Sequence, residues 1–364
     1  MKVNQTERWF RLALGALALF FAGVIYAWSI LSAPFARAVA DGGFGWDAKI
    51  LGLNYTIAIS SFCIGGFVSG LLSKRLPPRV RMVISAVLLF AGFFITSRLN
   101  PGVSPVALYL AYGVVAGVGI GFVYNTVIGM TNAWFPDRKG LCSGVLMMAF
   151  GFSSLVLGKI ADKLIGMESV GWRTTFLILA AAAGAALLLT AAFIKAPAPG
   201  TEFPKPKSVS GKKASAPAAA RDYTAVEMIK TLAFWQSFVY VLLMAAAGSA
   251  AISFAKGIIA DVDPEAPASF AVTVAGILSV FNGLGRLVSG ALIDRLGVRR
   301  TQYVTNTIAV AAPLIVVLSL SWGSLPLGVA GLCLCGFSYG CAPTASAAYS
   351  AAFFGQKNFS LNFS

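Results

Sequence analysis

The stretch FAVTVAGILSVFNGLGRLVSGALIDRLGVRR, residues 270–300, decides the fold, because it joins an apolar run to a basic turn. Residues 270–293 are predominantly apolar, and the run exceeds the roughly 20 residues that a transmembrane helix needs. Arg286 is the one charged residue in this run, and no carboxylate there neutralises it. A charge inside a membrane is costly, and it is by default a sign of function. We therefore expect Arg286 to bind an anion.

The composition is that of a polytopic membrane protein. Hydrophobic residues make up 58% of the 364 residues and charged residues 11%, whereas soluble domains contain about 25% charged residues. Apolar runs of spanning length recur along the chain, near residues 12–35, 50–73, 80–98, 105–130, 140–160, 172–194, 234–258, 271–293, 303–322 and 326–350. These runs predict an all-α polytopic fold with ten spans in a lipid bilayer.

The distribution of basic residues predicts the orientation in the membrane. If the N-terminus is cytoplasmic, the inside segments hold twenty of the 28 lysines and arginines and the outside segments seven, Arg286 being the remaining one. This asymmetry is what the positive-inside rule requires. We expect a multi-pass protein of the inner (plasma) membrane with a cytoplasmic N-terminus. The net charge of +15 is thereby explained without a nucleic-acid partner.

A polar stretch divides the chain into two halves that resemble each other. Residues 195–233 begin with a Pro-, Ala-, Ser- and Lys-rich segment, which predicts a flexible cytoplasmic linker. Residues 70–76 resemble residues 290–296, and residues 121–124 resemble residues 336–339. Repeated halves of six spans are a known transporter architecture. We expect two six-helix bundles: residues 1–194 hold six spans, and residues 234–364 hold four, so that two are missing from a truncated C-terminus.

A loop motif follows the apolar run that contains Arg286. Its spacing is Gly-x-x-x-Asp-Arg-x-Gly-x-Arg-Arg, and its members are Gly290, Asp294, Arg295, Gly297, Arg299 and Arg300. The first glycine allows close helix approach, the aspartate can cap or pair at a helix end, and the second glycine supplies a tight turn. The motif resembles the loop signature of the major facilitator superfamily. The first-half copy differs, with Lys74 at the acidic position and Pro77 at the turn glycine.

Four local strings carry a finer resemblance: GVIYAWS at 23–29, WFPDRKG at 134–140, FNGLGR at 281–286 and FGQKN at 354–358. Together they resemble the oxalate/formate antiporter family of the major facilitators. The resemblance implies that Arg286 helps to bind a carboxylate substrate. It also implies that aromatic side chains of the first, fourth and tenth spans line the cavity, and the best matches are Tyr26, Trp28, Tyr124 and Tyr339. The second binding cation of that family is a lysine of the eleventh span, which this sequence does not reach.

These observations indicate a secondary active transporter of small organic anions, with a mono- or dicarboxylate such as oxalate, formate or lactate as substrate. Two bundles would rock about a central cavity and open it to each side in turn. A bare cation in an empty cavity opposes closure because its desolvation is uncompensated, which favours exchange. Asn282 is a buried amide that could bind the substrate or join helices.

Alternatives remain for the function and for single residues. The chain could be a proton-coupled monocarboxylate symporter, a membrane sensor or a non-transporting truncated fragment. Arg286 lies about 12 Å of helix from Asp294, too deep to reach the interface fully, but it could be a structural arginine bonded to backbone carbonyls. The aromatic candidates could serve ordinary packing.

The sequence carries no sign of catalysis. It contains no histidine, its five cysteines show no zinc spacing, and no nucleophile–base pair or phosphate-binding glycine loop is present. We therefore expect no enzyme activity, no cofactor and no metal. We expect the protein to be a monomer.

Overall fold

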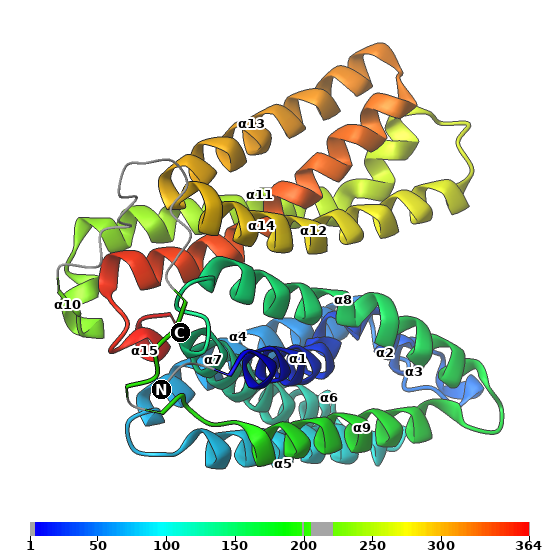
Figure 1. Cartoon of the computed structure of the whole chain (residues 1–364). Coiled ribbons are helices and arrows are strands. Elements are labelled where there is room, and N and C mark those ends of the chain that lie inside the picture. Colours follow the sequence, from blue (N-terminus) through cyan, green and yellow to red (C-terminus); the bar gives the residue numbers. More distant parts are fainter. Residues whose placement is uncertain (1–3, 199, 205–220, 364) are drawn as a thin grey trace. The chain divides into compact units, whose positions relative to one another are not determined.

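The computed structural model describes residues 4–198, 200–204 and 221–363, and the regular secondary structure of these residues is helical throughout (Figure 1). The described chain divides into two compact units. Unit 1 comprises residues up to Trp134 together with 149–201, and unit 2 comprises residues 135–148 and 202–363. Each unit is described separately below. The long helix α8 (Lys139–Gly166) contributes its first ten residues to unit 2 and the rest to unit 1.

Unit 1 contains the helices of the first half of the chain. Their bounds are α1 (Gln5–Ala22), η1 (Gly23–Ala27), α2 (Trp28–Leu31), α3 (Ala33–Ala36), η2 (Val39–Asp41), α4 (Ala48–Leu72), α5 (Pro78–Ser97), α6 (Pro105–Leu108), η3 (Tyr109–Ala116), α7 (Gly117–Ala133) and α9 (Gly171–Phe193). Helix α7 packs against α1, α4 and α5, and α9 packs against α1 and α5. The unit is thus a bundle with α7 among its central helices.

Unit 2 contains the helices of the second half. Their bounds are α10 (Ala225–Ile229), α11 (Leu232–Val262), α12 (Ala268–Leu296), α13 (Val298–Trp322), α14 (Leu325–Phe354) and α15 (Phe359–Phe363). Helix α14 packs against α11, α12 and α13. An apolar core joins these four helices around fully buried Ala255, Leu278, Ala312 and Leu332. This core holds α12, the helix that carries Arg286.

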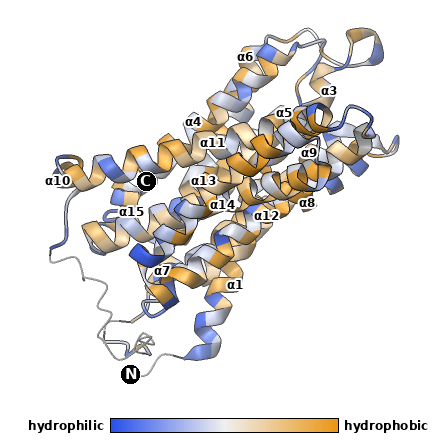
Figure 2. Ribbon diagram, turned by 90° about the horizontal axis from the view of Figure 1, so that it is seen from above, coloured by the Kyte–Doolittle hydropathy of each residue, from blue (hydrophilic) through white to orange (hydrophobic). Residues whose placement is uncertain are grey.

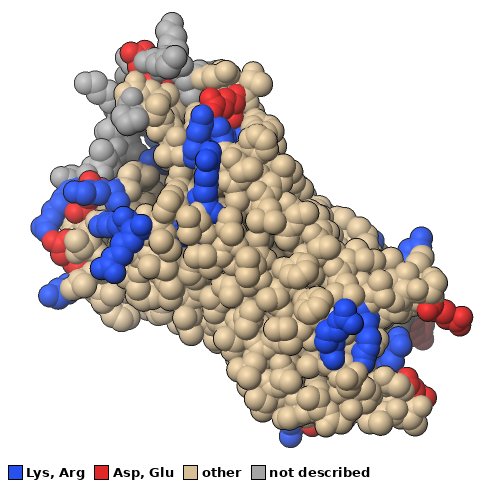
Figure 3. All heavy atoms as spheres, turned by 90° about the horizontal axis from the view of Figure 1, so that it is seen from below, with Lys and Arg blue, Asp and Glu red and all other residues tan. Residues whose placement is uncertain are grey.

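Ten helical segments of the described chain are long and apolar enough to cross a membrane. The predicted number of spans is therefore confirmed. In Figure 2 the apolar colours follow the helices and the polar colours concentrate at their ends and in the loops. On the face shown in Figure 3 the charged side chains lie in separate groups, and wide areas between the groups carry none. Both patterns are expected where a helix surface faces hydrocarbon.

The first span differs from the expected single run at 12–35. It begins at Gln5, where the side chain of Asn4 accepts the N–H groups of Thr6 and Glu7. After Ala22 the helix tightens into the 3₁₀ turn η1 and restarts as α2. At Gly23 a side chain would overlap the carbonyl of Phe150, so the glycine permits a close helix contact at this break.

The predicted linker at 195–233 is only partly open to description, because residues 199 and 205–220 lie outside the described part. Its last third contains α10 and the first residues of α11. A capping box starts α10: Glu227 donates its N–H to the Thr224 hydroxyl, and the Thr224 N–H donates to the Glu227 carboxylate over 2.8 Å. That backbone hydrogen bond is the main reason that the pKa of Glu227 lies below its usual value.

Candidate anion-binding site

Arg286 is buried in unit 2, with 6% of its surface exposed. Its Nη1 donates to the carbonyl oxygen of Met147 over 2.7 Å, and its Nε donates to Oδ1 of Asn282 over 3.2 Å. These are the hydrogen bonds of the guanidinium within the described chain, and Nη2 takes part in neither. Guanidinium carries five N–H donors. One arm of Arg286 thus has donors left for a ligand.

No carboxylate among the described residues forms an ion pair with Arg286. Asp294 lies two turns along α12, and its two oxygens are occupied elsewhere. The bond to Met147 corresponds to the alternative of a structural arginine bonded to backbone carbonyls. This hydrogen bond uses one N–H donor of the guanidinium and provides no counter-ion for its charge. The anion-binding interpretation of Arg286 is therefore retained.

Asn282 is the residue that orients Arg286. It is 8% exposed and lies one turn before Arg286 on α12. Its amide oxygen faces the guanidinium, while its backbone oxygen lies where a side chain at Gly340 would be. The i, i+4 spacing brings the two side chains together on one helix face. The structure therefore gives Asn282 a positioning role toward Arg286.

Small residues bring the start of α8 against α12 and thereby supply the Met147 carbonyl. A side chain at Gly290 would overlap the carbonyl of Gly140, and one at Gly140 would overlap the carbonyl of Gly290. A side chain at Gly144 would lie 2.6 Å from the Arg286 carbonyl oxygen. That same oxygen accepts a hydrogen bond from the Thr344 hydroxyl of α14 over 3.1 Å. Three helices therefore fix the backbone at Arg286.

The loop motif holds the same helix junction at its end. Asp294 accepts the backbone N–H groups of Gly140 and Leu141 over 2.8 and 2.7 Å, and so caps the first turn of α8 from α12. Gly297 has a φ of +82° and joins α12 to α13. The three motif arginines are exposed: Arg295, Arg299 and Arg300. The Nε of Arg299 donates to the hydroxyl of Tyr303 over 3.2 Å.

Tyr339 lies on α14 and is half-buried against α11. Its ring covers Gly248, and its hydroxyl accepts a hydrogen bond of 3.5 Å from Ser249. Among the described residues, no hydrogen bond joins it to Arg286. The structure thus places Tyr339 in the same unit as Arg286 and Asn282, at a different helix contact.

Two of the predicted aromatic residues come together in unit 1. Tyr26 and Tyr124 both pack edge-on against the ring of Phe150, with centroid distances of 5.3 and 5.1 Å. Phe62 completes the cluster 5.2 Å from Tyr124. Tyr26 is 37% exposed, so its ring is open on one side.

Trp28 lies apart from this cluster, at another place in unit 1. It is 5% exposed, and its indole N–H donates to the Leu51 carbonyl over 2.9 Å. Its ring packs on Tyr112 at 4.5 Å. The one hydrogen-bond donor of the Trp28 side chain is thus occupied by a backbone oxygen, and its ring is buried within unit 1.

Sequence reasoning missed several partners of the site. Met147 contributes a backbone oxygen, which any residue carries, so no sequence signal marks it. Phe62 and Phe150 lie in apolar spans where a phenylalanine is ordinary. Thr344 is a hydroxyl inside the tenth span, and this was the one available signal. Within the described residues, no group of three or more His, Cys, Asp or Glu side chains could hold a metal ion.

Comparison with known proteins shows the family to which this architecture belongs. The Major Facilitator Superfamily matches residues 9–362 of the chain. The MFS-type transporter YhjX of Escherichia coli, described as uncharacterized, is 30% identical over 99% of this chain and 84% of its own length. The oxalate:formate antiporter of Oxalobacter formigenes is 25% identical over 82% of this chain and 66% of its own length.

A solved structure shows the same fold. The E. coli fucose:proton symporter FucP has a TM-score of 0.67 at 15% identity, over 98% of this chain and 88% of that one. A likeness at this identity concerns the fold alone. Together with the ten spans, it confirms the predicted class of an all-α, major-facilitator-like membrane protein. The chain belongs to the Major Facilitator Superfamily of multi-pass membrane transporters.

Proposed function

We propose that this transporter carries small organic anions, mono- or dicarboxylates such as oxalate, formate and lactate. The observation that carries the proposal is Arg286: a buried cation within a span, held by two neutral oxygens and without an ion pair among the described residues. Keeping such a charge out of water is costly unless a counter-charge is provided. The relationship to the oxalate:formate antiporter supports a carboxylate as that counter-charge.

In the proposed mode of binding, a carboxylate meets the arm of the guanidinium that the protein leaves open. The donors are Nη2 and the remaining proton of Nη1, and they can form a two-pronged, charge-assisted pair. Asn282 and the Met147 carbonyl fix the plane of the guanidinium beforehand. Tyr26 and Tyr124 of unit 1, and Tyr339 of unit 2, are proposed as further contacts made during transport.

We propose exchange as the transport mode. A conformational change that closes an empty site must desolvate Arg286 without compensation, whereas a bound anion relieves this cost. The return step is therefore faster when a second anion is carried back. We also propose a cytoplasmic N-terminus and an inner-membrane location, on the basis of the twenty-to-seven distribution of basic residues.

Proton-coupled symport of a monocarboxylate is the second candidate. The sequence has no histidine, and its carboxylates lie in loops or at helix ends, so a proton would have to travel on the substrate. Reconstitution distinguishes the two modes. The full chain in proteoliposomes is given labelled oxalate, formate, lactate or pyruvate, with and without unlabelled anion inside, and with and without a pH gradient.

The exchange proposal predicts uptake that requires internal anion and responds little to the pH gradient. Uptake driven by an inward proton gradient into anion-free liposomes would favour symport instead. A neutral sugar serves as the control substrate and should not accumulate. Absence of uptake for all four anions under both conditions would contradict the anion-transport proposal.

A further inference from the structure

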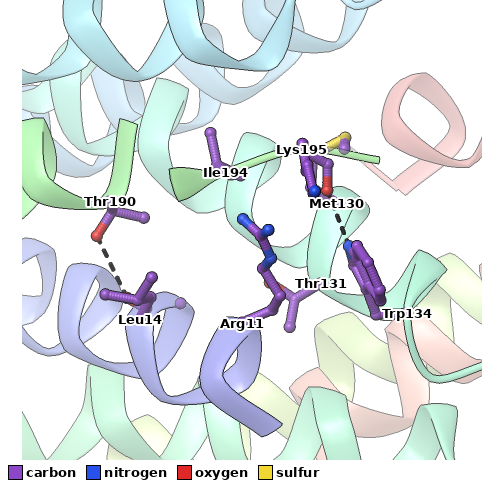
Figure 4. A pocket seen from close by; sticks show the side chains of 9 residues that line it. Arg11, Leu14, Met130, Thr131, Trp134, Thr190, Ile194 and Lys195 are labelled. Atoms are coloured by element: carbon purple, nitrogen blue, oxygen red, sulfur yellow. Dashed lines mark hydrogen bonds between the residues drawn. The ribbon is translucent and has the colours of Figure 1, made fainter. Parts of the chain in front are cut away.

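A second cationic site lies in unit 1, far along the sequence from Arg286. It is a small pocket that is partly open to the surroundings. Its walls come from α1, α7 and α9 and from the residues that follow α7 and α9. The side chains drawn in Figure 4 are Arg11, Leu14, Met130, Thr131, Trp134, Thr190, Ile194 and Lys195.

Arg11 reaches into this pocket from α1 (Figure 4). Its side chain is 11% exposed, its guanidinium lies 5.5 Å from the centroid of the Trp134 ring, and its Nη2 donates to the Glu7 carboxylate at 2.8 Å. Nε and Nη1 are buried and have no hydrogen-bond partner among the described residues. A buried donor without an acceptor costs about 1–3 kcal/mol, and more when it is charged. Two nitrogen atoms of the Arg11 guanidinium therefore lack hydrogen-bond acceptors, which oxygen atoms of a ligand would supply.

Positive charge exceeds negative charge around the pocket. Lys195 shares the Glu7 carboxylate with Arg11, at 3.1 Å, and the backbone oxygen of Lys195 is fixed by the Trp134 indole. Arg79 of α5 donates to the carbonyl oxygen of Ile194, a residue of the pocket wall. Two cations thus share one carboxylate, and a third is bonded to the pocket wall, which favours an anionic occupant.

The surroundings point to a lipid as the source of that anion. Phe10, next to Arg11, and Phe193, next to Ile194, pack edge-on at 5.6 Å and are each 45% exposed. Aromatic side chains at the end of a span are typical of the membrane interface. Basic pockets between transmembrane helices are known to bind lipid headgroups on the cytoplasmic side. The positive-inside rule assigns this end of α1 to that side.

We propose that this pocket binds the phosphate of an anionic phospholipid. The phosphate oxygens accept from Nε and Nη1 of Arg11 and from Nζ of Lys195, and the apolar part of the lipid lies along Phe10 and Phe193. Glu7 competes with the phosphate for the same two cations. The site is distinct from Arg286 and does not depend on which substrate is transported.

The test measures lipid binding to the full chain in neutral detergent, by native mass spectrometry and by the thermal unfolding midpoint. Three additions are compared: phosphatidylglycerol, phosphatidylcholine, and phosphatidylcholine with inorganic phosphate. We expect phosphatidylglycerol alone to raise the midpoint. Arg11→Gln should weaken its binding roughly five-fold, the effect of one basic residue near a lipid surface. Arg75→Gln, an exposed cation predicted on the same side, should leave it within about two-fold.

Two further variants keep the test decisive if Arg11→Gln fails to fold. Lys195→Gln removes a cation that is 54% exposed and should also weaken binding. Glu7→Gln removes the internal competitor and should strengthen it, which a purely structural role of the cluster would not do. Equal stabilisation by both lipids would overturn the proposal. So would full stabilisation by inorganic phosphate, or equal losses in Arg11→Gln and Arg75→Gln.

Discussion

Arg286 lies at a place where the described residues offer neutral oxygens and no carboxylate. An arginine with only a structural role could have been replaced by an apolar residue, since replacing a buried charge by an apolar group is often neutral or stabilising. The free-energy cost of burying the charge is offset if the charge binds an anionic ligand. We therefore propose that the guanidinium binds the substrate and that its two protein partners orient it.

The role of Asn282 as a positioning residue leads to a prediction with two variants. Asn282→Ala removes the acceptor of Nε, and because hydrogen bonds to charged groups contribute about 1.5–3 kcal/mol, anion affinity should fall roughly ten-fold. Asn282→Asp places a carboxylate at the same 3.2 Å position, so it should neutralise Arg286 and reduce affinity further. The KM of anion exchange in proteoliposomes measures both effects.

A matched control for these variants is Asn306→Ala, which removes an amide of α13 that accepts a hydrogen bond from Gln302. Its KM should stay near that of the unchanged protein. An Asn282→Asp variant that exchanges anions as well as Asn282→Ala would show that the two side chains do not act on the substrate together.

At the scale of helices, the contact between α8 and α12 depends on glycine. Gly290→Ala should destabilise the protein by about 1–3 kcal/mol, because the added Cβ overlaps the carbonyl of Gly140 and forces the helices apart. The control lies on the same helix: at Gly276 a Cβ would meet nothing within 4 Å. Gly276→Ala should be neutral or stabilising, since alanine favours a helix over glycine. The thermal unfolding midpoint in detergent should separate the two.

Asp294 adds an electrostatic contribution to the same contact. Its carboxylate faces the first turn of α8, where two N–H groups and the positive end of the helix dipole favour an anion. Asp294→Asn should therefore lower stability by about 1 kcal/mol. Glu265→Gln, at an exposed site in unit 2, should change the unfolding midpoint little. Equal midpoints for the two variants would mean that the cap contributes nothing measurable.

The number and order of the spans could be predicted from the sequence, because a helix that crosses the bilayer needs an apolar run of about 20 residues, and such runs are visible in the sequence. Local departures from these regular spans could not be predicted from the sequence. The break after Ala22 follows from a tertiary contact at Gly23, and α10 is a helix of five residues whose capping box stands outside any apolar run. Within the candidate site, Arg286 stood out in the sequence as a charge, whereas its partner Met147 contributes only a backbone oxygen. An indole in a span, such as that of Trp28, can line a surface or fill the interior, and the sequence alone does not distinguish the two.

At the scale of the whole molecule, the basic residues predict which ends of the spans face the cytoplasm. A chain whose natural cysteines have been replaced provides the test, with single cysteines introduced at Asp41 or at Arg75. Both positions are exposed loop or helix-end sites. A membrane-impermeant maleimide added to intact cells should label the cysteine at position 41 and not that at position 75. The reverse pattern would mean that the orientation is inverted.

If Arg286 holds the transported anion, as proposed, the rate of anion exchange must depend on its guanidinium. Proteoliposomes loaded with oxalate or formate are given the labelled anion outside, and the initial rate of exchange is measured. Arg286→Gln should reduce exchange by at least about a hundred-fold, since a charge-assisted, two-pronged contact is lost. Arg286→Lys should keep part of it, and Arg98→Gln, an exposed cation of unit 1, should exchange normally. Exchange by Arg286→Gln at the unaltered rate, in correctly inserted protein, would contradict the account.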